Sequence, residues 1–378
     1  MSTEGLSAPA SARIRRITAY GLRVPLVESV YHMSGGRSIT GFEVTLVRIE
    51  DEWGRSGWGE ITPLGQNYLP AYAEGARAGI AKVAPDLVGE DALQVDRIYS
   101  LMNAAIQGHP YVKSALDMAC WDLLGRHTGL PVCTLLGGRF GGEMPIYWAT
   151  SKGTPEEMVS NNRRLRSLGI RHFQLKVGGE PDLDIARIRA AAADLQNGET
   201  LVADANGGWT LHEAARVAGR IDDLDVYLEQ PCRTYAECLA IRRRSRLPFV
   251  LDESIDSLTA LARAIADGAM DAVNLKTSRV GGLTPARLMR DLSIANGIAL
   301  SIEDAAGADV ASAAVTHLAQ STPERFRLSV ALSSNKLAYR IGSGGPVHRN
   351  GRVSASTAPG LGVEPLGELL GEPLFVVA

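Results

Sequence analysis

Five charged residues in the second half of the chain constrain its fold most strongly. Each stands at or near the end of a short apolar run, in the order FQLKVGG, LVADANG, VYLEQP, FVLDES and AVNLKTS; they are Lys176, Asp204, Glu229, Asp252 and Lys276. Successive members are 28, 25, 23 and 24 positions apart, which is the length of one strand plus one helix. If each run is a parallel strand of a closed barrel, all five side chains meet at one mouth, as catalytic groups do in such barrels.

The rest of the sequence after residue 138 fits the same fold. Eight apolar runs are expected to be strands, with amphipathic helices between them: MPIYWAT, HFQLKV, LVADA, VYLEQ, FVLDE, AVNLK, ALSIED and RLSVAL. Eight strands close such a barrel, and strands buried on both faces read as continuous apolar runs. An open doubly wound sheet is the alternative, but no Gly-rich phosphate turn follows the first strand. We therefore expect an α/β fold, a TIM-like (β/α) barrel over residues 139–340.

The first third of the chain has a different pattern. The strand-like runs ITAYGLRVPL and FEVTLVRIE precede three segments with helical periodicity that end at glycines. A sheet followed by helices predicts a separate α+β unit over residues 14–138. We expect residues 1–13 to be disordered and the Gly-rich and Pro-rich residues 341–378 to pack back on the first unit.

Composition excludes several classes of partner. A net charge of −3 gives no reason to expect nucleic acid as a ligand. No run of 18 apolar residues exists, and no apolar segment follows the first charges, so we expect neither a membrane span nor a secretory signal and assign the chain to the cytoplasm. The four cysteines lack C-x-x-C spacing and are expected to be reduced and mostly buried.

The three carboxylates favour a divalent cation. Hard oxygen ligands suit Mg²⁺, with Mn²⁺ as a substitute, and no His or Cys lies at a matching strand end to favour zinc. Asn206 is expected to support the ligands, and Glu253 to orient Lys276 or Lys176. A single acid at a strand end is more often a helix N-cap, but three acids in register with two lysines reverse that expectation.

The two lysines come from the second and sixth of eight strands, so they are expected on opposite sides of a bound substrate. A cation that binds a substrate carboxylate stabilises the enolate formed when the neighbouring proton leaves. One lysine can remove that proton. The other can return a proton to the opposite face, or give one to a leaving hydroxyl.

These motifs resemble those of the enolase superfamily, in its muconate-lactonizing and mandelate-racemase-like branch. QLKVGG is similar to the family's second-strand lysine motif, DAN, EQP and DES to its metal motifs, and LKTSRVGGLT to the lysine motif of the opposite face. KSALDMACWDLLGRHTGLPVCTLLGG resembles its hinge between capping domain and barrel. The resemblance implies that residues 14–138 cap the barrel, with substrate-selecting loops near residues 28–38 and 62–70.

At finer grain, LGQNYLPAYAEGARAGIAKVAPDLVG and GHPYVKSALDMACWD resemble the proline-derivative group of this family. That group includes cis-3-hydroxyproline dehydratases and hydroxyproline-betaine epimerases. Two residues depart from the usual patterns: Gln174 stands where the family carries a lysine, and Ala306 where the group carries a Trp. We expect dehydration of cis-3-hydroxy-L-proline or a close cyclic amino acid. The alternatives are a racemase or epimerase of proline, hydroxyproline or proline betaine, and a metal-binding homologue without turnover.

A cyclic amino acid also needs a partner for its ammonium group. Glu303 and Asp304, at the end of the seventh strand, are the candidates, and Asp304 is preferred. Tyr68 and Trp148 are expected to offer cation–π faces in place of the missing Trp. The substrate is thus expected to be a small amino acid carboxylate, and the enzyme a homo-oligomer.

Overall fold

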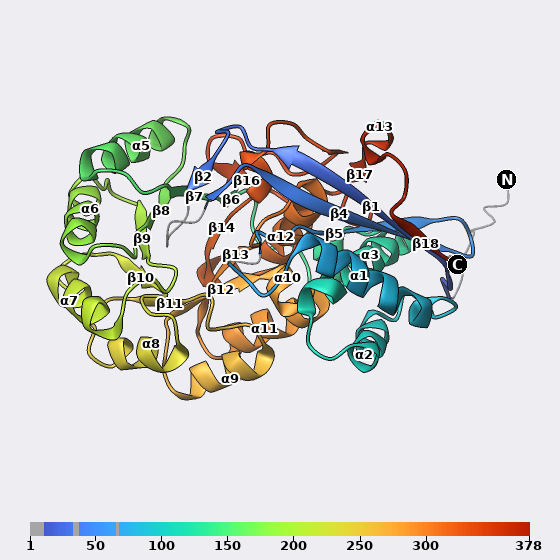
Figure 1. Cartoon of the computed structure of the whole chain (residues 1–378), viewed down its shortest axis with the longest axis horizontal. Helices are drawn as coiled ribbons and strands as arrows, with labels where there is room; N and C mark the ends of the chain where they lie inside the picture. Colours follow the sequence, from blue (N-terminus) through green and yellow to red (C-terminus); the bar gives the residue numbers. More distant parts are fainter. Residues whose placement is uncertain (1–10, 33–37, 66–67) are drawn as a thin grey trace.

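The chain has two parts that lie side by side, an eight-stranded barrel and a smaller unit of strands and helices (Figure 1). The structure, a computed structural model, describes residues 11–32, 38–65 and 68–378. The predicted fold class, a (β/α) barrel with an N-terminal α+β unit, is confirmed. The disorder predicted for residues 1–13 falls mainly outside the described residues, as do parts of both predicted substrate loops.

The barrel strands follow one another in chain order and are all parallel. They are β7 (Tyr147–Thr150), β8 (His172–Lys176), β9 (Thr200–Asp204), β10 (Tyr227–Glu229), β11 (Phe249–Leu251), β12 (Ala272–Lys276), β13 (Ala299–Glu303) and β14 (Arg327–Val330). A single bridge between Ile146, just before β7, and Val330 brings the first and last strands together. All eight predicted runs therefore lie in the barrel.

Helices and short 3-10 turns connect these strands around the outside of the barrel (Figure 1). They are α5 (Pro155–Ser167), α6 (Pro181–Ala193), α7 (Leu211–Ile221), α8 (Tyr235–Arg242), α9 (Leu258–Ala266), α10 (Thr277–Val280), α11 (Leu283–Ala295), α12 (Asp309–Gln320), η3 (Glu324–Phe326) and η4 (Ser333–Lys336). Local sequence fixes several helix starts: α5, α7 and α8 each begin at a Thr paired with a Glu three residues later in a capping box.

The smaller unit, the capping unit, is built on an antiparallel sheet of order β18-β1-β4-β5. Its strands are β1 (Ile14–Pro25), β4 (Gly41–Asp51), β5 (Ser56–Ile61) and β18 (Phe375–Val377), and a small hairpin joins β2 (Tyr31–His32) to β3 (Ser38–Ile39). Its helices are α1 (Ala73–Val83), η2 (Ala84–Leu87), α2 (Val95–Ala105), α3 (Pro110–Thr128) and α4 (Val132–Leu135).

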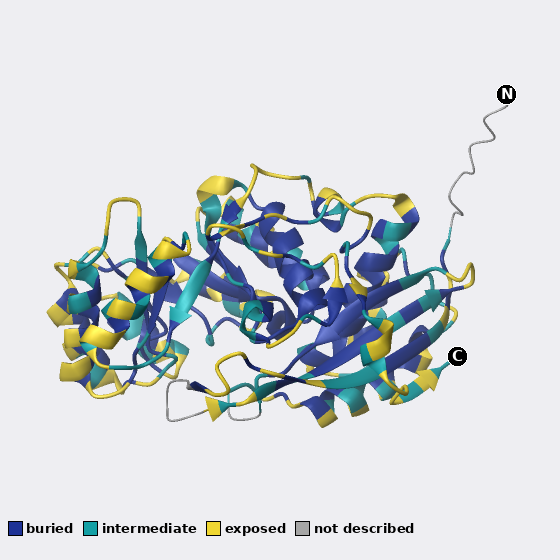
Figure 2. Ribbon diagram, turned by 90° about the horizontal axis from the view of Figure 1, so that it is seen from above, coloured by how far each residue is buried: buried dark blue, intermediate teal, exposed yellow. Residues whose placement is uncertain are grey.

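Two glycines of β5 let α3 lie directly on the sheet. A Cβ atom at Gly59 would stand 1.8 Å from the carbonyl oxygen of Ala115, and one at Gly57 would stand 2.2 Å from that of Ala119. Any side chain at either position would therefore push the helix away. Helix α3 is almost wholly buried because it also packs against α10 and α11 of the barrel (Figure 2).

A buried carboxylate joins the capping unit to the barrel. Glu60, in β5, accepts hydrogen bonds from the backbone N–H groups of Ala308 (2.6 Å), Val310 (3.1 Å) and Ala311 (3.0 Å) at the start of α12. An acidic group at a helix N-terminus satisfies free N–H groups and the helix dipole. Glu60 thereby fixes the connection between β13 and α12.

The last residues return to both parts of the molecule. β15 (Gly342–Ser343) pairs with β17 (Glu364–Pro365), β16 (Arg352–Val353) pairs with β6 (Met144–Pro145), and α13 (Gly367–Leu370) leads to β18 at the edge of the capping sheet. Within the described part of the chain, no helix has the length and apolar character needed to cross a membrane. The four cysteines are free and buried, as predicted.

Candidate active site

The charged residues predicted to converge lie in register at one end of the barrel. Lys176 is the strand partner of Asp204, and Asp204 is the strand partner of Glu229. Lys276 pairs with Glu303 in the same way. Asp252 directly follows β11. Since β8 and β12 are four strands apart in a barrel of eight, the two lysines come from opposite sides of the mouth.

Two of the three acids are paired with cationic side chains. Lys176 Nζ lies 2.5 Å from Asp204 Oδ2. Lys276 Nζ lies 2.7 Å from Asp252 Oδ2, and Arg279 Nη1 lies 2.6 Å from Asp252 Oδ1. Burial alone would raise the pKa of Asp252, but Arg279 and Lys276 hold it well below its ordinary value.

The third acid has only neutral hydrogen-bond donors around it. Glu229 accepts a hydrogen bond from Gln174 Nε2 (2.9 Å) and another from Asn274 Nδ2 (2.9 Å), and no Lys or Arg of the described residues lies within ion-pair distance. Burial, followed by the charges of Asp204 and Asp252, raises the pKa of Glu229 well above its ordinary value. An added cation beside these acids would relieve that repulsion.

The charge balance of the mouth also leaves room for a cation. Five buried or mostly buried carboxylates influence one another there, against three cationic side chains: Asp204, Glu229, Asp252, Glu253 and Glu303 against Lys176, Lys276 and Arg279. With all groups ionised, two negative charges are unbalanced, which equals the charge of one divalent ion. Asp304 and Lys336 also line the pocket and add one charge of each sign.

The acids are not gathered around a single point as they stand. Over the described ranges, no group of three His, Cys, Asp or Glu side chains is already arranged to hold a metal ion. Asp204 and Asp252 are turned toward their lysines instead. The donor set nevertheless fits a hard divalent ion, since it consists of buried carboxylate oxygens with an excess of negative charge.

The lysines are held in their protonated form by these pairings. Burial would lower the pKa of Lys176, but the charge of Asp204 raises it above its ordinary value. Burial would likewise lower the pKa of Lys276, but the charge of Asp252 raises it above its ordinary value. A lysine that is to act as a base must lose its proton. It therefore requires the negative charge of its carboxylate partner to be taken up by another cation.

The two candidate ammonium contacts at the end of β13 differ. The carboxylate of Asp304 accepts hydrogen bonds from the hydroxyls of Thr277 and Ser278 and from the backbone N–H groups of Ser278 and Ala305. Glu303 accepts from Asn274 Nδ2 (2.8 Å) and from the Tyr147 hydroxyl, and its Oε1 lies 3.3 Å from Lys276 Nζ. Asp304 thus acts here as an acceptor for the turn after β12, and Glu303 is the better placed of the two to face a ligand.

The predicted supporting pair forms a contact of its own. Asn206 donates from its backbone to Asp204 (2.8 Å) and from its side chain to Glu253 Oε1 (3.0 Å), while Glu253 Oε2 is buried without a hydrogen-bond partner. Asn206 thus reaches Asp204 through its backbone N–H and Glu253 through its side chain, and its support of the metal ligands stays a prediction. Among the described residues, Glu253 forms no hydrogen bond with either lysine. Burial, followed by the charge of Asp252, raises the pKa of Glu253 to about 7.

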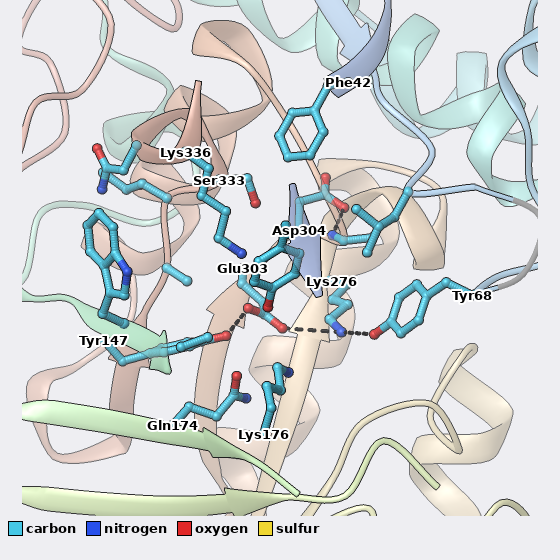
Figure 3. A pocket seen from close by; sticks show the side chains of 18 of the residues that line it. Phe42, Tyr68, Tyr147, Gln174, Lys176, Lys276, Glu303, Asp304, Ser333 and Lys336 are labelled. Atoms are coloured by element: carbon cyan, nitrogen blue, oxygen red, sulfur yellow. Dashed lines mark hydrogen bonds and ion pairs between the residues drawn. The ribbon is translucent and has the colours of Figure 1, made fainter. Parts of the chain in front are cut away.

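A pocket opens directly above these groups (Figure 3). Its barrel side includes both lysines, Gln174, Glu303 and Trp148, and the capping unit contributes Tyr31, Phe42, Leu64 and Tyr68. Tyr68, which is predicted to offer a cation–π face to a substrate ammonium, lines this pocket, and its hydroxyl accepts a hydrogen bond from Lys276 Nζ at 2.5 Å. Ala306, which stands where the proline-derivative group carries a Trp, is buried and is not one of the residues that line the pocket.

Sequence reasoning missed several groups of the mouth. Asn274 lies two residues before Lys276 on the same strand face, as Gln174 does before Lys176, and this alternation was a usable signal. Arg279 belongs to the quoted motif LKTSRVGGLT but was given no role. Tyr147 and Lys336 carried no pattern that marked them, because their places depend on how loops and strands pack in three dimensions.

The chain matches family models over most of its length. Residues 22–137 match the family described as mandelate racemase / muconate lactonizing enzyme, N-terminal domain. Residues 157–369 match the family described as enolase C-terminal domain-like.

Individual relatives span nearly the full chain. It is 48% identical over 362 residues to a cis-3-hydroxy-L-proline dehydratase of Roseibium aggregatum, covering 96% of this chain and 99% of that protein. An N-succinyl-L-Arg/Lys racemase of Bacillus cereus is 28% identical, with 93% of this chain and 95% of that protein covered. A solved mandelate racemase/muconate lactonizing enzyme of Roseovarius nubinhibens, complexed with magnesium, superposes with a TM-score of 0.93 at 37% identity, covering 97% of this chain and 100% of that one.

Proposed function

The chain belongs to the mandelate racemase/muconate lactonizing enzyme family of the enolase superfamily, and we propose that it uses Mg²⁺ to dehydrate cis-3-hydroxy-L-proline or a close cyclic amino acid. The observation that carries this proposal is the mouth itself, where three buried acids stand between two lysines from opposite sides of the barrel. The 48% identity to a dehydratase of that substrate supports the choice of ligand.

Asp204, Glu229 and Asp252 would hold the divalent cation. When bound, the ion would act as a Lewis acid that stabilises the negative charge developing on a substrate carboxylate. Gln174 and Asn274 support this assignment because they hold Glu229 from two sides without neutralising it. Mn²⁺ is expected to substitute for Mg²⁺ in an all-oxygen site.

The two lysines perform the proton chemistry at the α-carbon. Each forms an ion pair with an acid, and that pairing must loosen before either lysine can accept a proton. Glu303, held by Asn274 and Tyr147, is assigned to the substrate ammonium.

The stereochemistry of the substrate suits opposed groups. In cis-3-hydroxy-L-proline the hydroxyl and the carboxylate share one ring face, so the α-hydrogen lies on the other face from the hydroxyl. Elimination then requires a base on one face and a proton donor on the other. In trans-3-hydroxy-L-proline both leaving groups lie on one face, and we expect elimination at least about 100-fold slower.

Racemisation or epimerisation of proline or its betaine is the second candidate. It needs the same two lysines, and racemases are among the relatives. The two activities are separated by nuclear magnetic resonance in D₂O with Mg²⁺ and either cis-3-hydroxy-L-proline or L-proline. Formation of a pyrroline-2-carboxylate supports dehydration, whereas α-deuteration with inversion supports racemisation. If the chain produces neither, both assignments are wrong.

A further inference from the structure

A third lysine enters the same pocket. Lys336, at the end of η4 after the last barrel strand, extends its side chain into the pocket from the side opposite Tyr68 in the view of Figure 3. Its Nζ lies 3.9 Å from the centre of the Tyr31 ring. In the part of the chain that the structure describes, no carboxylate lies within ion-pair distance of it. This lysine has no role in the chemistry assigned above.

Its surroundings differ from those of the two lysines at the strand ends. Lys176 and Lys276 form ion pairs with Asp204 and Asp252, whereas Lys336 contacts the ring and the phenol of Tyr31, both uncharged groups, and lines the pocket. An ammonium that is not bound to a carboxylate can give its proton to another acceptor with less loss of hydrogen bonding. Lys336 is therefore suited to donate a proton to a ligand.

The backbone holds Lys336 firmly against the capping unit. Val27 N donates to Lys336 O at 2.9 Å, and Ala338 N donates to Pro25 O at 2.9 Å, on either side of the bridge between Leu26 and Leu337. Tyr31 follows four residues after Val27. The lysine and the ring beside it are thus placed by one connection between the two parts of the molecule.

We propose that Lys336 is the acid that protonates the departing 3-hydroxyl group during dehydration, an inference that rests on the proposed function. A strand-end lysine takes the α-proton, and the electron pair of that C–H bond forms the C2=C3 double bond. The C3–O bond breaks, and the oxygen takes its electron pair and a proton from the Lys336 ammonium to leave as water. The enamine becomes the cyclic imine when a proton moves from nitrogen to C3, and solvent reprotonates Lys336.

This assignment also limits the position of the base. Lys336 follows β14, which is two strands from β8 and two strands from β12 around the barrel, so the strand order places it between Lys176 and Lys276. Because the hydroxyl and the α-hydrogen lie on opposite ring faces, the base must approach the ring from the face that is turned away from Lys336. The base for the L-substrate is then the one of Lys176 and Lys276 that lies on that face.

The test compares a substrate that needs an acid with one that does not. Chloride leaves without protonation, so cis-3-chloro-L-proline should bypass Lys336. Lys336→Met is expected to slow dehydration of cis-3-hydroxy-L-proline about 100-fold or more. It should keep chloride elimination and α-deuterium exchange into L-proline within about threefold of the unsubstituted enzyme.

Two further variants control for charge and folding. Lys336→Arg keeps the charge but is a much weaker acid, so it should dehydrate as poorly as Lys336→Met. Lys152→Met removes a positive charge from the adjoining cavity of about 420 Å³, which shares Tyr31 and Lys336 with the pocket, and should leave dehydration unchanged.

The results separate a failure of the Lys336 assignment from a failure of the proposed function. If Lys336→Met dehydrates at the original rate, or if Lys336→Arg restores dehydration, Lys336 is not the proton donor. If chloride elimination and exchange fall as far as dehydration, Lys336 serves substrate binding or folding and the inference is also wrong. If the unsubstituted enzyme itself forms no pyrroline product, the proposed function fails instead.

Discussion

The barrel mouth and the capping unit contribute different chemistry to one pocket. Among the described lining residues, every charged side chain comes from the barrel: Lys176, Lys276, Glu303, Asp304 and Lys336. The capping unit adds only uncharged side chains, Tyr31, Phe42, Leu64 and Tyr68. The charged groups mostly stand at strand ends fixed by the sheet register, whereas the tyrosines stand beside residues that the structure does not describe. The difference suggests that the barrel sets the reaction and the capping unit sets the shape of the site.

Removing a barrel lysine should produce the largest effect. Lys276→Ala is expected to lower dehydration about 1,000-fold or more and to abolish α-deuterium exchange into one enantiomer of proline, because it removes one of the two lysines assigned to proton transfer at the α-carbon. Steady-state rates and proton spectra in D₂O measure both. Lys82→Ala, on the exposed face of α1, is the control. A Lys276→Ala enzyme with normal turnover would remove this residue from the mechanism.

Removing a barrel acid should weaken metal binding. Glu229→Gln keeps the shape of the side chain but loses its charge, and we expect the Mg²⁺ affinity to fall about 100-fold by calorimetry. Glu372→Gln changes the same charge at an exposed position near the C-terminus and should bind Mg²⁺ as before. Equal affinities in the two variants would mean that Glu229 is not a ligand.

The joint between the two parts should respond to pH. Burial raises the pKa of Glu60 to about 7, so this carboxyl group binds its proton more tightly in the folded chain than in the unfolded chain. The associated stability is fully present below the unfolded pKa of about 4.5 and is lost as pH rises through about 7. Relative to Glu60→Gln, the unsubstituted chain should lose on the order of 2 kcal/mol between pH 5 and pH 8.

Thermal unfolding of both proteins across that pH range measures the difference. Asp117 and Asp122 also have raised pKa values, but they titrate in both proteins and cancel. Parallel pH profiles of the two proteins would show that Glu60 keeps an ordinary pKa.

A change in the capping unit should have the smallest effect. Tyr68→Phe removes the hydroxyl that accepts from Lys276 and keeps the ring, so we expect kcat to fall by about 3-fold to 10-fold. Tyr72→Phe, at an exposed position, should change nothing. If Tyr68→Phe lowered activity as much as Lys276→Ala, the division of labour between the two parts would be wrong.

The sequence predicted the barrel well because strand-end residues obey a simple spacing. Lys176, Asp204, Glu229 and Lys276 end their strands, as expected from runs separated by one helix. The sequence could not predict which groups would donate hydrogen bonds to the Asp304 carboxylate, since these donors belong to the turn that follows β12. It also could not place Tyr68 against Lys276, because that contact spans the two parts of the molecule.

The most direct measurement is a crystal structure of the chain grown with Mn²⁺, with the anomalous signal recorded. We expect one strong peak bounded by the carboxylates of Asp204, Glu229 and Asp252, with Lys176 and Lys276 released from Asp204 and Asp252 and facing the pocket from opposite sides. Protein that remains free of metal at saturating Mn²⁺, with both lysine–aspartate pairs intact, would contradict a mechanism built on these three acids.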